Sequence, residues 1–173
     1  MRADNRRRMK LAANFLLFQT AWFWCVLAPV GWDAAGGALL FVVHLRYIAA
    51  PREWRALMIV TIAGAAIDSA LITAGLLRFT PEAVLAPPWL IVMWCHFAST
   101  LPHSLRWLSQ NRLLAAAGGA LFAPLAYHGA VALSDKCDIP VSFLQFAAVQ
   151  APLWALLMPT AFFIVHVFDK KRT

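Results

Sequence analysis

The sequence predicts an all-α fold: a polytopic membrane protein with six transmembrane helices and both termini in the cytoplasm. Three observations lead to this prediction. Hydrophobic residues make up 62% of the chain, whereas charged residues make up only 13%. The hydrophobic residues form six long runs. The basic residues gather at the two ends of the chain and in alternate gaps between the runs.

The composition excludes an ordinary soluble domain, which carries roughly 45–50% apolar and about 25% charged residues. A chain of 173 residues with a mean hydropathy of +0.68 cannot cover its surface with charge, so we expect that surface to face lipid. The net charge of +7 is confined to the ends of the apolar runs and forms no pattern that reads nucleic acid. Nucleic acid is therefore not an expected partner. No linker divides the chain, which we interpret as one transmembrane domain, residues 1–173.

Each run is long enough for a membrane-spanning helix, which needs about 17–25 residues. The first run is too long for a signal-peptide core and lacks a cleavage site, so we expect it to be retained. The second is the shortest, and prolines or short polar segments separate the later runs. None alternates polar and apolar residues, so a lipid-facing barrel is not expected. The expected helices are residues 11–31, 34–50, 56–77, 87–105, 113–133 and 143–168.

The orientation follows from counting basic residues on alternate sides of these helices. One side carries Arg2, Arg6, Arg7, Arg8, Lys10, Arg46, Arg52, Arg55, Arg106, Arg112, Lys170, Lys171 and Arg172. The other side carries only Arg78 and Lys136. Because basic residues are enriched in cytoplasmic segments, this asymmetry places both termini in the cytoplasm.

Asp68 is the strongest candidate for a functional residue, because it lies in the middle of the third helix. A carboxylate in hydrocarbon costs at least about 2.5–3.5 kcal/mol, so it must be protonated, paired or in contact with water. One interpretation is a structural hydrogen bond to another helix, and the other is a catalytic or transport role. His96 lies at a similar depth on the fourth helix. We expect Asp68 to face the bundle interior and to lie within reach of His96, directly or through one water.

The fourth helix also carries a polar stripe, formed by His96, Ser99, Thr100 and His103. Together with Asp68, and with Asn14 and Gln19 of the first helix, these residues are the candidates for a polar pocket. The alternative interpretation is hydrogen bonding between helices only, worth around 0.6 kcal/mol per bond. Tyr127 and His128, near the outer end of the fifth helix, are expected at the membrane interface.

Three histidines, His44, His103 and His166, lie at similar depth near the cytoplasmic boundary and could bind a metal or haem. Each is alone on its helix at that depth, and the sequence places no acidic ligand beside them. Neither a metal site nor a cofactor is therefore expected. The sequence does not decide whether the three histidines converge.

Three stretches have the look of a known family. They are Asn14-Phe-Leu-Leu-Phe-Gln-Thr-Ala-Trp-Phe23, the run from Trp94 to Leu108 with its Trp-Cys-His-Phe-Ala-Ser-Thr-Leu-Pro-His-Ser core, and Ala123-Pro-Leu-Ala-Tyr-His-Gly129. The chain resembles a domain-of-unknown-function family of small proteobacterial inner-membrane proteins. In that family an amide residue precedes the histidine that matches His103, where this chain has Pro102. The resemblance implies genes near those of cyclopropane-fatty-acid-synthase-like methyltransferases, and hence a link to membrane-lipid modification.

Three functional hypotheses follow. The first is a multi-pass inner-membrane protein that acts as an accessory or lipid-binding component in membrane-lipid modification or envelope stress. Its expected partners are membrane lipid and a lipid-modifying enzyme. The second is a small proton-coupled transporter that uses Asp68 and His96. The third is a membrane haem or metal protein. Whether the protein is an enzyme, and its oligomeric state, are left open by the sequence.

Overall fold

The computed structural model of the protein describes residues 2–51 and 53–170. In this part of the chain six α-helices, a short 3₁₀ helix and a two-stranded ribbon follow one another. They are α1 (Arg2–Leu27), α2 (Trp32–Tyr47), α3 (Trp54–Thr73), β1 (Arg78–Phe79), α4 (Pro88–Thr100), η1 (Arg106–Gln110), α5 (Arg112–Leu133), β2 (Cys137–Asp138) and α6 (Phe143–Lys170). The prediction of an all-helical fold is confirmed.

The helix boundaries depart from the apolar runs for local reasons. The first helix starts at Arg2 because the basic tail continues the helix, and it ends at Leu27, shortly before Pro29. The third ends at Thr73, and Gly75 follows with φ of 72°, a left-handed conformation that glycine adopts without strain. The fourth ends at Thr100, because Pro102 has no N–H with which to continue the helix.

Four of the helices in the described part of the chain, α1, α3, α5 and α6, are long and apolar enough to cross a membrane. The other two are shorter than expected: α2 has 16 residues and α4 has 13. At about 1.5 Å per residue they extend roughly 24 and 20 Å, less than the ~30 Å of hydrocarbon. The six-span prediction is therefore confirmed only in its coarser form, a bundle with four candidate spans.

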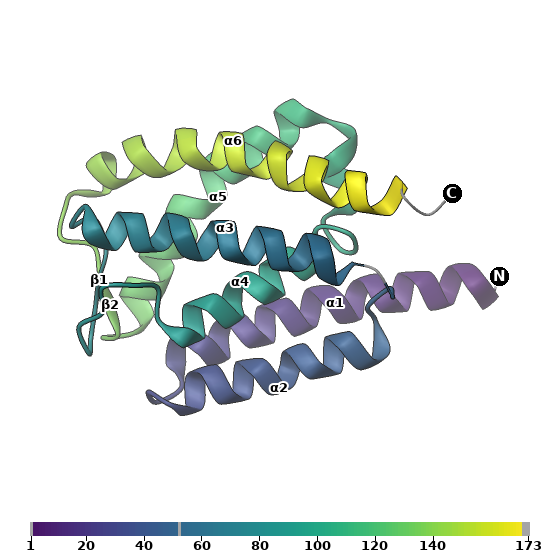
Figure 1. The fold of residues 1–173 in the computed structure, drawn as a ribbon, viewed down its shortest axis with the longest axis horizontal. Helices are drawn as coiled ribbons and strands as arrows, with labels where there is room; N and C mark the ends of the chain where they lie inside the picture. The colour runs from purple at the N-terminus through teal and green to yellow at the C-terminus, as the bar shows by residue number, and fades with distance from the viewer. Residues whose placement is uncertain (1, 52, 171–173) are drawn as a thin grey trace.

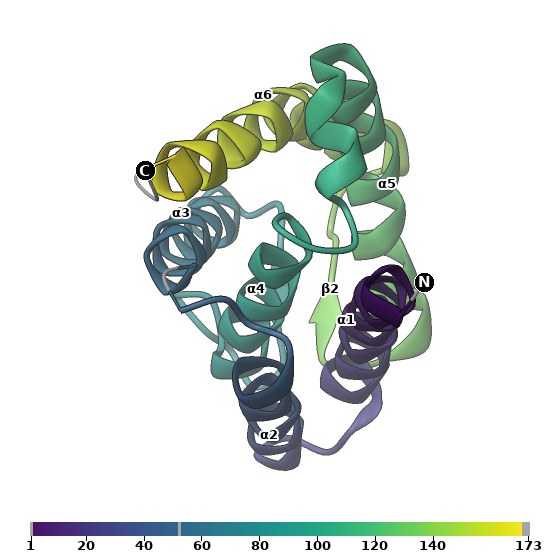
Figure 2. The same ribbon diagram turned by 90° about the vertical axis from the view of Figure 1, so that its right-hand side faces the viewer.

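The short helix α4 lies at the centre of the bundle and contacts α1, α2 and α3 (Figure 2). On one side α1 and α2 form a hairpin, and on the other α5 and α6 form a second hairpin that contacts α3 through α6. Neighbouring helices enclose α4. A helix in this position does not need to extend across the whole hydrocarbon layer, because protein surrounds it.

The two ends of the bundle differ in charge. We call the end where α1, α3 and α5 begin and α2, α4 and α6 end the basic end. The first and last residues that the structure describes, Arg2 and Lys170, lie there (Figure 1). The opposite ribbon end carries β1 and β2, which pair antiparallel with Arg78 opposite Asp138 and Phe79 opposite Cys137. Arg52, Lys171 and Arg172, counted above for the basic side, lie outside the described residues.

Large apolar side chains lie on the surface of the bundle as well as in its core. Large apolar side chains such as Ile62, Phe122 and Leu156 are 63–72% exposed. The interior holds buried polar side chains: Asn14, Asp33, His44, Thr61, Asp68, His96, Ser99, Thr100 and Gln150. An apolar surface of this kind is stable in lipid, and buried polar groups then need partners within the bundle.

Candidate functional site

A carboxylate held between two histidines lies at the basic end. Glu53 accepts a hydrogen bond from each imidazole: Oε1 is 2.9 Å from Nε2 of His44, and Oε2 is 3.0 Å from Nε2 of His103. The side chains of His44, Glu53 and His103 are 1%, 7% and 15% exposed. We call these three residues the His–Glu–His cluster. Three separate segments build it, since His44 lies in the last turn of α2, Glu53 precedes α3, and His103 follows α4.

The backbone helps to hold Glu53 as an anion. Its Oε2 also accepts a hydrogen bond from the backbone N–H of Ala50 at 2.9 Å. Burial by itself raises the pKa of Glu53, but hydrogen bonds from His103, His44 and Ala50 outweigh it and bring that pKa down from 4.5 to about 2. The carboxyl group is therefore ionised at neutral pH.

Asn14 of α1 ties this cluster to the turn after α4. Its Oδ1 accepts hydrogen bonds from the backbone N–H of Ser104 at 3.2 Å and from the Ser104 hydroxyl at 2.7 Å. Its Nδ2 donates to the carbonyl and hydroxyl oxygens of Ser99, both at 3.3 Å, and lies 3.4 Å from Nδ1 of His44. Of the residues expected in one polar pocket, Asn14 and Ser99 are thus hydrogen-bonded to each other, and His103 belongs to the adjoining His–Glu–His cluster.

A cavity of about 1260 Å³ opens beside the cluster. Glu53 and His103 form part of its wall. Its basic lining residues come from α1, η1 and the start of α5. Its apolar lining comes from the end of α6 and also from α1, η1 and the segment after α4. The basic residues are Arg6, Arg7, Lys10, Arg106 and Arg112, and the apolar residues include Leu11, Leu101, Leu108, Phe162, Phe163 and Val165. The cavity thus combines positive charge with an apolar wall.

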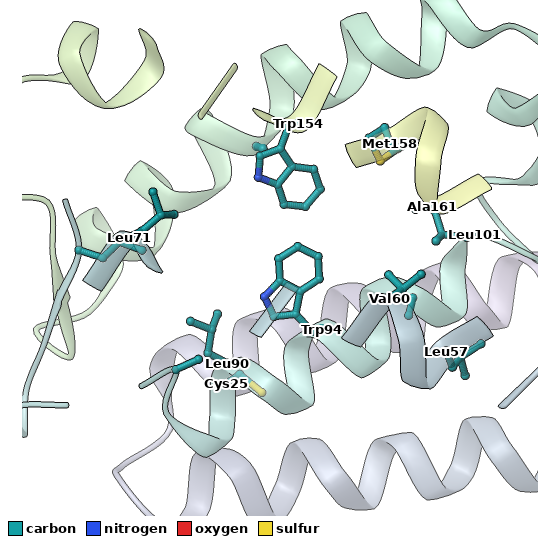
Figure 3. Close-up of a cluster of buried hydrophobic side chains, with 14 of the residues drawn as sticks. Cys25, Leu57, Val60, Leu71, Leu90, Trp94, Leu101, Trp154, Met158 and Ala161 are labelled. Carbon is teal, nitrogen blue, oxygen red and sulfur yellow. The ribbon is translucent and has the colours of Figure 1, made fainter. Parts of the chain in front are cut away.

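A second polar cluster lies in the middle of the bundle. Asp68 is completely buried and accepts hydrogen bonds from Nε1 of Trp94 at 2.6 Å and from the hydroxyl of Tyr127 at 2.5 Å. The Trp94 ring stacks on Trp154, with centroids 5.2 Å apart and planes at 14° (Figure 3). Asp68 of α3 is therefore linked to α4 through Trp94 and to α5 through Tyr127, and each carboxyl oxygen has a hydrogen-bond donor.

The expected pair of Asp68 and His96 does not form. His96 instead bonds through Nε2 to the backbone carbonyl oxygen of Gly37 at 2.9 Å, which links α4 to α2. Trp94 and His96 are two positions apart, so they point about 200° apart around the helix axis. The prediction was based on the similar depth of Asp68 and His96 along their helices. It did not take into account the direction in which each side chain points around its helix axis. Asp68 does face the interior, as expected, and Tyr127, expected at the interface, is one of its partners.

The remaining candidates have smaller roles. Thr100 donates only to the carbonyl oxygen of Phe97 in its own helix, at 2.6 Å, and the Ser99 hydroxyl also donates within α4, to His96. Gln19 is half-buried and has no hydrogen-bond partner among the described residues. His166 is exposed on the cavity wall, outside the His–Glu–His cluster. Of the three histidines considered for a metal, two therefore converge.

The sequence analysis missed Glu53, Trp94 and the partner of Lys136. Glu53 is the acidic residue in the otherwise basic segment between the second and third apolar runs. That position was the one feature of the sequence that could have pointed to it. At the ribbon end Lys136 binds Asp33 at 2.9 Å, and it also donates to the carbonyl oxygens of Cys25 and Ala28. Nothing in the local sequence connects Lys136 with Asp33, since they are 103 positions apart.

An all-helical bundle with an exposed apolar surface, buried polar clusters and four candidate spans defines a multi-pass helical membrane protein. A family model described as a protein of unknown function, DUF2878, matches residues 11–160. The chain therefore belongs to this family, which bears out the resemblance to a domain-of-unknown-function family. No curated protein and no solved structure matches the chain.

Proposed function

We propose that this protein binds an anionic membrane lipid in the cavity at its basic end, and that this end faces the cytoplasm of a bacterial inner membrane. The observation that carries the proposal is the lining of the cavity. Five basic side chains and a set of apolar side chains border the same space of about 1260 Å³. A phospholipid presents the complementary chemistry, a negative headgroup joined to an apolar tail.

The charges favour an anion. The only acidic residue that lines the cavity, among the residues that the structure describes, is Glu53, and its carboxylate is engaged by His44 and His103. Among the described residues, the lining therefore carries five basic side chains of lysine and arginine and one acid. A basic residue near an anionic membrane surface contributes about 1 kcal/mol of attraction to lipid headgroups. The lipid headgroup would lie at the mouth of the bundle, with its tail along the end of α6.

We further propose an accessory role in membrane-lipid modification or envelope stress, in which the protein holds a lipid for a separate lipid-modifying enzyme. The described residues offer a binding cavity for such a lipid. The transporter hypothesis depended on Asp68 and His96 sharing a proton, and these residues bond instead to Trp94, Tyr127 and Gly37. We therefore do not propose transport.

Native mass spectrometry of the purified protein, titrated with phosphatidylglycerol or phosphatidylcholine, tests the binding proposal. The wild-type protein is expected to retain phosphatidylglycerol in preference to phosphatidylcholine. The double variant Arg6→Gln/Lys10→Gln removes two charges from the lining. At about 1 kcal/mol per charge it is expected to bind phosphatidylglycerol roughly 30-fold more weakly.

The matched control is Arg46→Gln/Arg55→Gln, which removes two exposed basic residues from the same end outside the cavity lining. It changes the net charge equally and is expected to leave the affinity within about twofold, since these charges do not line the cavity. Equal binding of the two lipids by the wild-type protein, or an equal loss in both double variants, would contradict the cavity as the lipid site.

A further inference from the structure

We propose that His44, Glu53 and His103 form a binding site for a divalent transition-metal ion, with zinc as the best-fitting ion. Each residue offers one ligand atom, and the three atoms lie within 4.8 Å of one another. Two imidazole nitrogens and a carboxylate oxygen form a recurring ligand set for zinc in proteins. The inference goes beyond lipid binding and does not depend on it.

The present distances are close to those of a loaded site. Zinc binds imidazole nitrogen and carboxylate oxygen at about 2.0–2.2 Å in a tetrahedral arrangement. Two ligand atoms at that distance are roughly 3.3–3.6 Å apart. In the structure each histidine Nε2 lies 2.9 or 3.0 Å from its carboxylate oxygen. The two imidazoles contact different oxygens of Glu53, and the three ligand atoms lie within 4.8 Å of one another. Shifts on the order of 1 Å therefore bring one atom of each residue to these separations.

The surroundings leave one coordination position open. The His44 side chain is 1% exposed and closes the inner side of the site. Glu53 and His103 line the basic cavity, so the fourth position faces that cavity. Because the lining is positively charged, an anionic fourth ligand is favoured there over neutral water.

Loading changes which nitrogen of His44 carries its proton. A metal on Nε2 requires the proton on Nδ1. In the structure Nδ1 lies 3.4 Å from the amide nitrogen of Asn14, which also donates to the carbonyl and hydroxyl oxygens of Ser99. The Asn14 amide therefore keeps hydrogen-bond partners when its contact with His44 is lost.

Titration of the metal-depleted full-length protein in detergent with Zn²⁺, followed by calorimetry, tests the site. A parallel titration with Co²⁺, followed by visible absorption, reports the coordination geometry. The wild-type protein is expected to bind one equivalent of either ion and to give the strong absorption of four-coordinate Co²⁺. Both measurements use the metal alone, so their outcome is independent of lipid binding.

Two variants remove a ligand, Glu53→Gln and His103→Ala. Loss of a direct ligand is expected to weaken Zn²⁺ binding by more than the 10–100-fold typical of an outer-shell change, and to abolish the Co²⁺ absorption. His166→Ala, on the same cavity wall but outside the cluster, is the matched control and is expected to bind normally. Cys137→Ser controls for binding to a free thiol and is also expected to bind normally.

Glu53→Gln keeps the size of the side chain and one acceptor oxygen. Its helical circular dichroism and elution volume are therefore expected to match those of the wild-type protein. Wild-type protein that binds no stoichiometric Zn²⁺ would overturn the proposal. So would folded Glu53→Gln and His103→Ala variants that bind the ion as tightly as the wild-type protein.

Discussion

Trp94 donates its indole N–H to Asp68 across 2.6 Å, and this bond joins the central helix α4 to α3. The Tyr127 hydroxyl donates to the other carboxyl oxygen from α5. Three helices thus meet at one buried carboxyl group. The geometry gives Asp68 a clear structural role, since both of its oxygens are satisfied by donors from neighbouring helices.

Replacing Tyr127 with Phe is expected to destabilise the protein by about 1–3 kcal/mol, because one oxygen of the buried carboxyl group loses its donor. Asp68→Asn is expected to cost less, about 1 kcal/mol or below. Its amide oxygen can accept from Trp94, while its amide N–H₂ can donate to a Tyr127 hydroxyl that turns. The free energy of unfolding in mixed detergent micelles measures both effects. A larger loss in Asp68→Asn than in Tyr127→Phe would contradict this account.

Gly64 allows the Trp94 ring to lie against α3. A Cβ atom at this position would be 2.0 Å from the ring atom Cδ2, and the ring is confined between α3 and Trp154. We expect Gly64→Ala to destabilise the protein by at least about 1–3 kcal/mol through overpacking. A Cβ atom at Gly118, also in a helix, would have no neighbouring atom within 4 Å, so Gly118→Ala is expected to stabilise the protein by up to about 1 kcal/mol. Thermal unfolding in detergent compares the pair, and similar shifts would contradict the close contact.

Lys136 and Asp33 form a buried ion pair at the ribbon end, with side chains 12% and 3% exposed. Lys136→Met leaves Asp33 without its cation and is expected to destabilise the protein by about 3–5 kcal/mol. Adding Asp33→Asn to Lys136→Met should recover part of that loss, because the uncompensated charge is removed. Arg78→Gln, an exposed change at the same end, is the control and is expected to be nearly neutral. Additive losses in the double variant would show that the two residues are not coupled.

The membrane orientation is tested by reporter fusions. Fusions in η1 and after Thr173, which itself lies outside the described residues, are expected to report cytoplasm. Fusions beside Glu82 and Asp135, in the loops of the ribbon end, are expected to report periplasm. This outcome follows from the concentration of basic residues at one end of the bundle. A periplasmic signal from the η1 fusion would invert the orientation on which the proposed lipid site depends.

Much of the architecture could be predicted because it depends on local properties of the chain. The backbone of an apolar segment in lipid must satisfy its own hydrogen bonds, so the long runs predict helices without reference to neighbours. All six helices are present, and the two basic residues of the minority side, Arg78 and Lys136, both lie at the ribbon end. The predicted helix boundaries are wrong at particular ends. The basic tail extends α1 toward the start of the chain, and Pro102 ends α4 earlier than predicted.

The partners of the buried polar residues were decided only by the tertiary structure. Depth along a helix can be counted from the sequence, and by depth alone His96 matched Asp68. Direction around the helix axis depends on how each helix is rotated against its neighbours, and this rotation points Trp94 to Asp68 and His96 to Gly37. In the same way, residues of α2, the α2–α3 loop and the turn after α4 meet at Glu53. Side-chain packing sets those rotations, and it involves contacts between segments that the chain order leaves far apart.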